Sequence, residues 1–292
     1  MKIKNLHIKE FKGLRDISIN FEKNDKPLDL VVLVGSNGSG KTRVLESILD
    51  YFQKIVNHIE NENVAGVFFE TDEQNCLNQG YNSNMLYLIL NNYNDENIVE
   101  RGRKVVEENL KVFPKIIYVP TETNFQKVEI ASPMLVREYK FLNIVDTGLI
   151  KDVPSYIATR IIEMANDQED TPMQEIRTAV FKEINEIFEI LDLDIKISGI
   201  SKNAKSIPIF TNSSGDKFDI NELSSGEKQL FLRTLAIKML NPENSIILID
   251  EPELSLHPKW QQRIVDVYRK IGKNNQIIIA THSPHILGSV KK

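Results

Sequence analysis

Apolar and polar residues alternate in two short stretches at the start of the chain. These stretches are residues 2–9 and residues 16–21, and a Lys12-Gly13 turn signal lies between them. Alternation of this kind is typical of strands that are buried on one face only. The pattern therefore predicts an antiparallel hairpin or meander at the N-terminus.

A continuous apolar run, Leu30–Val34, follows and ends at Gly35. Such a run predicts a strand that is buried on both faces. From Thr42 to about Gln53 the apolar residues recur on one stripe, which predicts an amphipathic helix. The residues of this stripe are Val44, Leu45, Ile48, Leu49 and Phe52.

Predicted strands and helices alternate in the last third of the chain. Ile207–Phe210 and Lys217–Ile220 predict a hairpin, in which Pro208 favours an edge position for the first strand. A helix, a strand, a helix and a strand are then predicted at about residues 226–240, 246–249, 258–271 and 276–280. Together with the core-like run Ile116–Val119, this order indicates an α/β fold with a mainly parallel core sheet.

The middle of the chain differs in composition. Ten of the forty residues from 61 to 100 are asparagine, and two strand-like runs, Val64–Phe69 and Met85–Leu90, are embedded there. We expect a peripheral insertion with long polar loops. Residues 154–192 predict helix, either packed on its own domain or used as an arm for dimerisation or partner binding. The apolar residues that recur in this helix are Ile176, Val180, Ile184, Ile187, Phe188 and Leu191.

The composition of the chain argues against several classes of protein. The 292 residues are 41% hydrophobic and 26% charged with a net charge of −5, which is ordinary for a globular protein and argues against coating nucleic acid by bulk charge. The single cysteine, Cys76, excludes an internal disulfide and indicates a reducing compartment. No apolar run approaches the roughly 18–20 residues that span a bilayer, and the N-terminus lacks the apolar core of a signal peptide. We expect a cytoplasmic protein with no membrane partner.

One segment has the pattern of a phosphate-binding loop. Residues 35–42 read Gly-Ser-Asn-Gly-Ser-Gly-Lys-Thr and match G-x-x-x-x-G-K-[ST] in full. Glycines let the backbone turn, so that N–H groups and the helix N-terminus face a phosphate. Lys41 adds a mobile positive charge and Thr42 offers its hydroxyl to Mg²⁺. The predicted nucleotide-binding residues are Ser36, Asn37, Gly38, Ser39, Gly40, Lys41 and Thr42.

Two carboxylates, Asp250 and Glu251, end the predicted strand at residues 246–249. On a parallel sheet that also carries the phosphate loop, this strand ends beside the nucleotide. Asp250 is expected to hold Mg²⁺ directly or through water, and Glu251, which points the other way, to polarise the attacking water. A solvated pair of charges at a strand end is the alternative interpretation.

A third motif separates this chain from other nucleotide-binding proteins. Residues 223–229 read Leu-Ser-Ser-Gly-Glu-Lys-Gln. Ser225 and Gly226, followed by Glu227, open a predicted helix whose N–H groups and hydroxyl can bind a γ-phosphate; ordinary N-capping is the alternative. The segment resembles the LSGGQ signature of ATP-binding-cassette (ABC) ATPases, in the LSSGEKQ form of their soluble branch.

Further segments fit the same resemblance. His282 closely follows a predicted strand and resembles the switch histidine that contacts the γ-phosphate in this family. Residues 253–261 lie at the D-loop position, where His257-Pro258 looks like the RecF/OLD group rather than transporters. Residues 8–16 resemble the opening shared by RecF, SMC-like and OLD-type ATPases. The family's glutamine loop has one candidate, Gln126.

The resemblance implies one ABC-type P-loop ATPase domain over residues 1–292, with an N-terminal antiparallel β-subdomain and a helical insertion. Its parts are residues 1–60 with the phosphate loop, residues 61–205 as the insertion, and residues 206–292 with the signature, acidic strand and switch. The cofactors implied are ATP and Mg²⁺.

The resemblance also implies a catalytic arrangement. Glu251, His282 and Lys41 would hydrolyse ATP, with Thr42 and Asp250 on Mg²⁺. The enzyme would be a head-to-tail homodimer, in which Ser225, Gly226 and Glu227 of one copy close on ATP held by the other.

OLD-type nucleases resemble the chain up to about His282 and continue into a Toprim nuclease domain that this sequence does not contain. Either an effector comes on another polypeptide or the chain is a fragment. We expect an ATPase that gates or scaffolds a nuclease or toxin effector in bacterial antiphage defence of the OLD, Septu or PARIS kind.

The alternative is a RecF-like or SMC-like repair ATPase that binds DNA. Five N-terminal cations would then form a DNA-facing patch, although a solvated strand edge explains them equally well. They are Lys2, Lys4, Lys9, Lys12 and Arg15. Two further classes fit less well. The N-terminal opening at residues 8–16 argues against the ATPase of a transporter. The presence of Glu251 and His282 argues against a scaffold that binds ATP without hydrolysing it.

Overall fold

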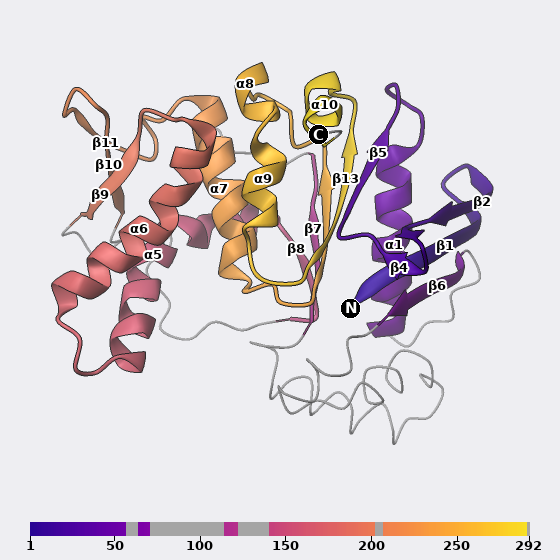
Figure 1. Ribbon diagram of the computed structural model, residues 1–292, viewed down its shortest axis with the longest axis horizontal. Coiled ribbons are helices and arrows are strands. Elements are labelled where there is room, and N and C mark those ends of the chain that lie inside the picture. Colours follow the sequence, from indigo (N-terminus) through magenta and orange to yellow (C-terminus); the bar gives the residue numbers. More distant parts are fainter. Residues whose placement is uncertain (57–63, 71–113, 122–139, 202–206, 291–292) are drawn as a thin grey trace.

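The computed structural model describes residues 1–56, 64–70, 114–121, 140–201 and 207–290 (Figure 1). Three features of the sequence analysis lie outside these residues: Cys76, the predicted strand Met85–Leu90 and the glutamine-loop candidate Gln126. Among the helices of the described ranges, none has both the length and the apolar character needed to cross a membrane.

A five-stranded sheet forms the centre of the molecule (Figure 1). Its neighbouring strands all pair in parallel, which confirms the predicted core sheet. In spatial order the strands are β5 (Leu30–Val34), β13 (Gln276–Thr281), β12 (Ile246–Asp250), β7 (Ile116–Val119) and β8 (Leu142–Ile144). Because the strands run the same way, their C-terminal ends share one edge, where α/β proteins of this type bind ligands.

Side chains of the central strands alternate between two hydrophobic clusters, one on each face of the sheet. Leu248 and Ile278 pack in the cluster that includes α1 (Lys41–Val56) and the N-terminal strands. Ile247 and Ile279 pack in the other cluster, which includes buried residues of five helices. These helices are α5 (Thr147–Asp167), α6 (Met173–Leu191), α7 (Ser225–Met239), α9 (Ile264–Arg269) and α10 (Pro284–Val290). The helix after the phosphate loop and the helix of the signature segment thus cover opposite faces (Figure 1).

The N-terminal strands form an antiparallel sheet in the order β2-β1-β6. Its strands are β1 (Lys2–Phe11), β2 (Leu14–Asn20) and β6 (Val64–Glu70). The predicted hairpin is confirmed, and φ is +46° at Lys12 and +87° at Gly13, as a tight turn with two positive φ angles requires. The strand predicted at Val64–Phe69 also forms, but it pairs with β1 instead of standing apart in an insertion. A short ribbon of β3 (Glu22–Lys23) and β4 (Lys26–Pro27) follows β2.

The predicted helical segment 154–192 is divided into α5 and α6. Helix α5 begins earlier than expected, because the Asp146 side chain accepts a hydrogen bond of 2.9 Å from the N–H of Leu149 and caps the helix. The apolar stripe predicted in α6 is buried against α5, α7 and α9 of the same chain. The structure therefore supports a helix packed on its own domain rather than a free arm.

A second small sheet has the order β11-β10-β9. Its strands are β9 (Lys196–Ile200), β10 (Pro208–Thr211) and β11 (Lys217–Asp219). The predicted hairpin is confirmed, but the edge position predicted for its first strand is wrong, since β10 lies between the other two. Pro208 is the first residue of β10, a position at which a strand tolerates a missing N–H.

Two further predictions need correction. Strand β5 is only half-buried, and Val34 is 46% exposed, because β5 lies at the edge of the five-stranded order. The helix predicted at residues 258–271 is interrupted and forms α8 (Pro258–Gln261) and α9. Helix α10 (Pro284–Val290) ends the described chain.

Candidate functional site

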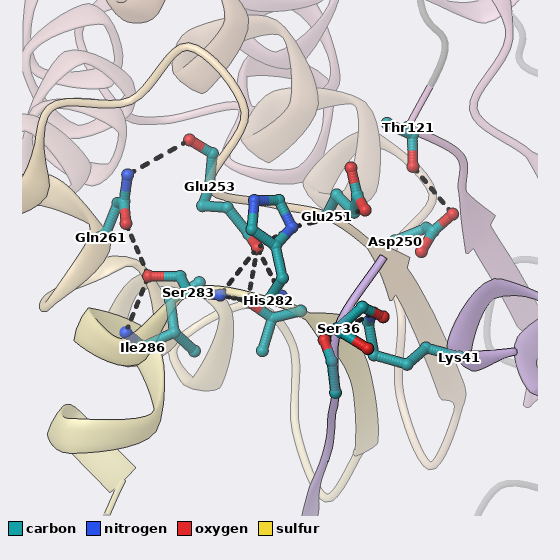
Figure 2. A network of polar contacts seen from close by, with 12 residues as sticks. Ser36, Lys41, Thr121, Asp250, Glu251, Glu253, Gln261, His282, Ser283 and Ile286 are labelled. Carbon is teal, nitrogen blue, oxygen red and sulfur yellow. Dashed lines mark hydrogen bonds and ion pairs between the residues drawn. The ribbon is translucent and has the colours of Figure 1, made fainter. Parts of the chain in front are cut away.

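The phosphate loop connects β5 to α1 at the C-terminal edge of the central sheet. Lys41 is the first residue of α1 and is buried, whereas residues 36–39 are exposed. The Lys41 Nζ donates hydrogen bonds of 2.9 Å to the carbonyl oxygens of Gly35 and Ser36 (Figure 2). The loop therefore surrounds one ammonium group at the start of a helix, which is an arrangement suited to phosphate.

Two glycines of the loop are needed for its backbone path. Gly38 has a φ of +78° and Gly40 a φ of +94°, values that L side chains rarely adopt. A Cβ atom at Gly40 would also lie 2.8 Å from Cδ2 of Leu14. The N-terminal hairpin thus packs directly on the phosphate loop.

Thr42 and Asp250 meet although the two motifs are far apart in sequence. The Thr42 hydroxyl donates a hydrogen bond of 3.0 Å to Asp250 Oδ1. The second oxygen, Oδ2, accepts a hydrogen bond of 2.8 Å from the hydroxyl of Thr121 (Figure 2). The sequence analysis missed Thr121; its signal was a polar residue just beyond the buried strand β7, which neighbours β12.

The environment of Asp250 raises the pKa of its carboxyl group, mainly through burial. Burial raises its pKa, the hydrogen bonds from Thr121 and Thr42 lower it, and the charges of Glu251 and Glu46 raise it again. A carboxylate that is held away from water beside like charges is well placed to receive a cation. The Thr42 hydroxyl and the Asp250 carboxylate are oxygen donors of the type that Mg²⁺ prefers, so the donor set fits this ion.

Glu251 and His282 form a second pair at the same edge. Glu251 follows β12 with a φ of +42°, and its N–H donates a hydrogen bond of 2.9 Å to the carbonyl of Ala280. Its Oε1 lies 3.5 Å from Nδ1 of His282, which comes directly after β13 (Figure 2). The structure therefore brings together the predicted water-polarising carboxylate and the predicted switch histidine.

Glu253 is a central member of the site that the sequence analysis did not select. It is 4% exposed, and its Oε1 accepts hydrogen bonds from the hydroxyl of Thr281 and from the N–H groups of His282 and Ser283. Its sequence signal was weak, because a glutamate two positions after Glu251 also suits an exposed loop.

Arg233 is a second residue that sequence reasoning missed. It lies in α7 and is 1% exposed, and burial lowers the pKa of its guanidinium against the attraction of nearby carboxylates. Its nitrogens donate hydrogen bonds to the backbone carbonyls of Pro120 and Thr121, both at 3.0 Å, and of Glu251 at 3.3 Å. The helix of the signature segment is thereby tied to the ends of β7 and β12. An arginine inside an apolar helical run was the available signal.

The signature segment opens α7 as predicted. Ser224 is the N-cap, and its hydroxyl and N–H form a capping box with Glu227. The Glu227 carboxylate therefore accepts a hydrogen bond within its own helix start. Ser225 is exposed at the helix start, whereas Gly226 is buried. The capping interpretation and the phosphate-binding interpretation are therefore compatible, since capping uses Ser224 and leaves Ser225 facing solvent.

Gly226 packs on the segment after the acidic pair. A Cβ atom there would lie 2.8 Å from the carbonyl oxygen of Ser255 and 3.0 Å from a ring carbon of Trp260. Only glycine allows this approach. The predicted D-loop, residues 253–261, thus lies against the start of α7.

The N-terminal cations are mostly paired. Lys2, Lys4, Lys12 and Arg15 lie 2.6–3.4 Å from the carboxylates of Asp29, Glu22, Glu46 and Glu10. These carboxylates offset the positive charge that a DNA-facing patch would need. Lys2, Lys4 and Lys9 lie on β1, the middle strand of its sheet, so the strand edge expected from the sequence is not where these cations lie.

Comparison with known proteins gives two family matches along consecutive parts of the chain. A model described as "AAA ATPase domain" matches residues 1–144, and a model described as "AAA domain, putative AbiEii toxin, Type IV TA system" matches residues 150–288.

Similar proteins span nearly the whole chain. The Septu protein PtuA of Bacillus thuringiensis is 27% identical over 314 residues, which cover 98% of this chain and 72% of PtuA. The retron Vc95 probable ATPase of Vibrio cholerae serotype O1 biovar El Tor is 23% identical over 376 residues, covering 99% of this chain and 72% of that protein. An SmcHead, solved bound to the C-winged helix domain of ScpA, shares the fold with a TM-score of 0.53 at 17% identity, over 99% of this chain and 92% of that one.

Proposed function

We propose that this chain, which matches ATPase-domain models over residues 1–144 and 150–288 and shares the fold of an SmcHead, hydrolyses ATP at a site completed by a second copy of itself. The observation that carries the proposal is the junction of the phosphate loop with the acidic strand. The Thr42 hydroxyl and the Asp250 carboxylate are 3.0 Å apart, and the Glu251–His282 pair belongs to the same edge of the sheet.

Each residue has a task that its position supports. Lys41 and the N–H groups of the loop bind the β- and γ-phosphates. Glu251 accepts a hydrogen bond from the attacking water and orients it, and His282 contacts the γ-phosphate. Thr42 and Asp250 hold Mg²⁺, which when bound offsets negative charge on the phosphates.

The second copy is proposed because one chain has its two phosphate-binding segments on different helices. Helix α1 and helix α7 cover opposite faces of the central sheet. The exposed Ser225 at the start of α7 would instead bind the γ-phosphate held by another copy. A head-to-tail pair with two-fold symmetry forms two such sites at once.

We place the ATPase in antiphage defence, where its nucleotide state gates or scaffolds a nuclease or toxin effector. The similarity to Septu PtuA and to a retron ATPase over nearly the whole chain supports this role. The pairing of the N-terminal cations with carboxylates favours this role over DNA binding by these cations. Co-purification of the chain with the products of adjacent genes tests the effector; DNA binding that weakens steeply with salt would favour the repair alternative.

Mixing two inactive variants tests the shared site. Lys41→Ala removes the phosphate ligand, and Ser225→Asp places a negative charge where the γ-phosphate of the other copy would lie. Each alone should be inactive. A mixed dimer retains one site with an intact Lys41 and an intact Ser225, so an equal mixture should recover up to about a quarter of the wild-type rate. If the subunits of the mixture are shown to exchange and no ATPase activity returns, the shared site is contradicted.

A further inference from the structure

We propose that Glu253 is a positioning residue that orients His282 for ATP hydrolysis and couples it to the segment of residues 253–257. This inference rests on the function proposed above. It assigns a specific task to a buried carboxylate that follows the acidic pair in sequence and lies beside the switch histidine (Figure 2).

One oxygen of Glu253 accepts hydrogen bonds from three consecutive residues around the switch histidine, Thr281–Ser283, which we call the switch segment. Its Oε1 accepts a hydrogen bond of 2.6 Å from the Thr281 hydroxyl and hydrogen bonds of 2.8 and 3.1 Å from the N–H groups of His282 and Ser283. Because Glu253 is 4% exposed, water competes little for these donors. The bonds fix the backbone on both sides of a histidine whose own side chain is 41% exposed.

The same oxygen also lies beside the imidazole ring. Glu253 Oε1 is 3.2 Å from Nδ1 of His282, closer than Glu251 Oε1 at 3.5 Å. Because an ionised carboxylate only accepts hydrogen bonds, its nearness favours the tautomer with the hydrogen on Nδ1. Nε2 is then the ring nitrogen left to meet a phosphate. With Glu253 holding the ring, the Glu251 carboxylate is left for the attacking water.

A second connection ties Glu253 to the same switch segment. The Ser283 hydroxyl donates a hydrogen bond of 2.6 Å to Oε1 of Gln261, and Nε2 of Gln261 donates to the carbonyl oxygens of Leu256, at 2.9 Å, and Glu253, at 3.5 Å (Figure 2). A movement of residues 253–257 would therefore shift His282.

This segment also adjoins the surface proposed to meet the second copy. The Ser255 carbonyl packs on Gly226 beside the exposed Ser225, and Leu254 is 43% exposed. Binding of a second copy at Ser225 would thus contact residues 253–257. Through Glu253, that contact would bring the His282 side chain into its catalytic orientation only when the second copy completes the site.

Glu253→Gln tests the proposal, since it keeps the size of the side chain and removes its charge. We expect the Kd for ATP to stay within about twofold and kcat to fall about tenfold or more, the usual effect of losing an orienting partner of a histidine. In a His282→Ala background the same change should have no further effect, because the two residues act as a unit. Glu186→Gln makes the same charge change on the exposed surface of α6 and should hydrolyse ATP at the wild-type rate.

Nitrogen-15 NMR of the imidazole in the nucleotide-free protein provides a readout that does not need activity. We expect His282 to carry its hydrogen on Nδ1 in the wild type and to shift toward the Nε2–H form in Glu253→Gln. If the substituted protein does not fold, Thr281→Val removes the shortest of the hydrogen bonds to Glu253. This variant keeps the carboxylate, so we expect kcat to fall while the hydrogen stays on Nδ1 of His282.

Three results would overturn the proposal: an unchanged kcat in the tested variant, an unchanged tautomer in Glu253→Gln, or multiplicative losses in the double variant. A wild type that fails to hydrolyse ATP would refute the proposed function instead, and the tautomer comparison would still decide the role of Glu253.

Discussion

The hydroxyl of Thr42 donates a hydrogen bond of 3.0 Å to Asp250, a residue 208 positions further along the chain. The bond joins the start of α1 to the end of β12, across the intervening strand β13. The phosphate motif and the acidic motif therefore form one site. A change in either motif should affect nucleotide chemistry without disturbing the hydrophobic clusters on the two faces of the sheet.

Replacement of Lys41 by alanine should abolish ATP binding, because the loop loses its buried positive charge. The free energy of unfolding without nucleotide should fall by about 1–3 kcal/mol, since the lost contacts are two hydrogen bonds to carbonyls. Titration calorimetry with ATP measures the first effect and urea denaturation the second. Arg43→Ala, an exposed cation two positions on, is the control and should still bind. Tight binding by Lys41→Ala would rule out the phosphate-loop assignment.

Replacement of Glu251 by glutamine should separate binding from hydrolysis. The side chain keeps its size, while the carboxylate that would accept the proton of the attacking water is lost, so kcat should fall by a factor of about 10² or more. ATP should then accumulate in a closed dimer, visible by size-exclusion chromatography with light scattering. Wild-type turnover would remove the role proposed for Glu251.

Ser225 and Gly226 should respond differently to substitution. Even Gly226→Ala places a Cβ 2.8 Å from the Ser255 carbonyl, so the free energy of unfolding should fall by about 1–3 kcal/mol. Ser225→Asp adds a negative charge at the exposed start of α7, which should leave stability unchanged or raise it by about 0.3–1 kcal/mol. Thermal denaturation without nucleotide compares them. A stable Gly226→Ala variant would show that this close approach is not tight.

Motifs that are continuous in sequence could be found from sequence alone. The phosphate loop, the acidic pair and the segment at residues 223–229 are local, because each depends on neighbouring residues at the end of one strand or the start of one helix. The alternation of strands and helices likewise predicted the parallel sheet. Helix capping by Ser224 explains why the last of these motifs also begins a helix.

Residues that act through tertiary contacts could not be found in the same way. Thr121, Arg233 and Glu253 reach the site only because β7, α7 and the segment after β12 converge on one edge of the sheet. The local signals of these residues, such as an arginine in an apolar helical run, do not show which distant elements they contact. The positions of β6 and β10 within their sheets depend on pairing with distant strands, which local patterns do not determine.

The stability of the protein should depend on pH through Lys115, which is fully buried at the start of β7 and donates a hydrogen bond to the carbonyl of Asn241. Burial lowers the pKa of Lys115 to about 8, against an attraction by Glu243. In the unfolded chain a lysine has its ordinary pKa of about 10.4. Between these values the unfolded state binds more protons than the native state, so the contribution of Lys115 to stability rises with pH.

Lys115→Met removes the buried charge while keeping much of the side-chain volume. It should raise the free energy of unfolding at pH 7 by on the order of 2 kcal/mol, because the wild type keeps a charged amine out of water at that pH. This gain in the free energy of unfolding should shrink as pH rises from about 8 to about 10.4. In that range the amine of the native wild type is already neutral, whereas that of the unfolded chain is still charged. Urea denaturation at pH 7 and pH 10 measures the difference, with the exposed Lys182→Met as the control. An equal gain at both pH values would mean that packing, rather than the charge of Lys115, accounts for it.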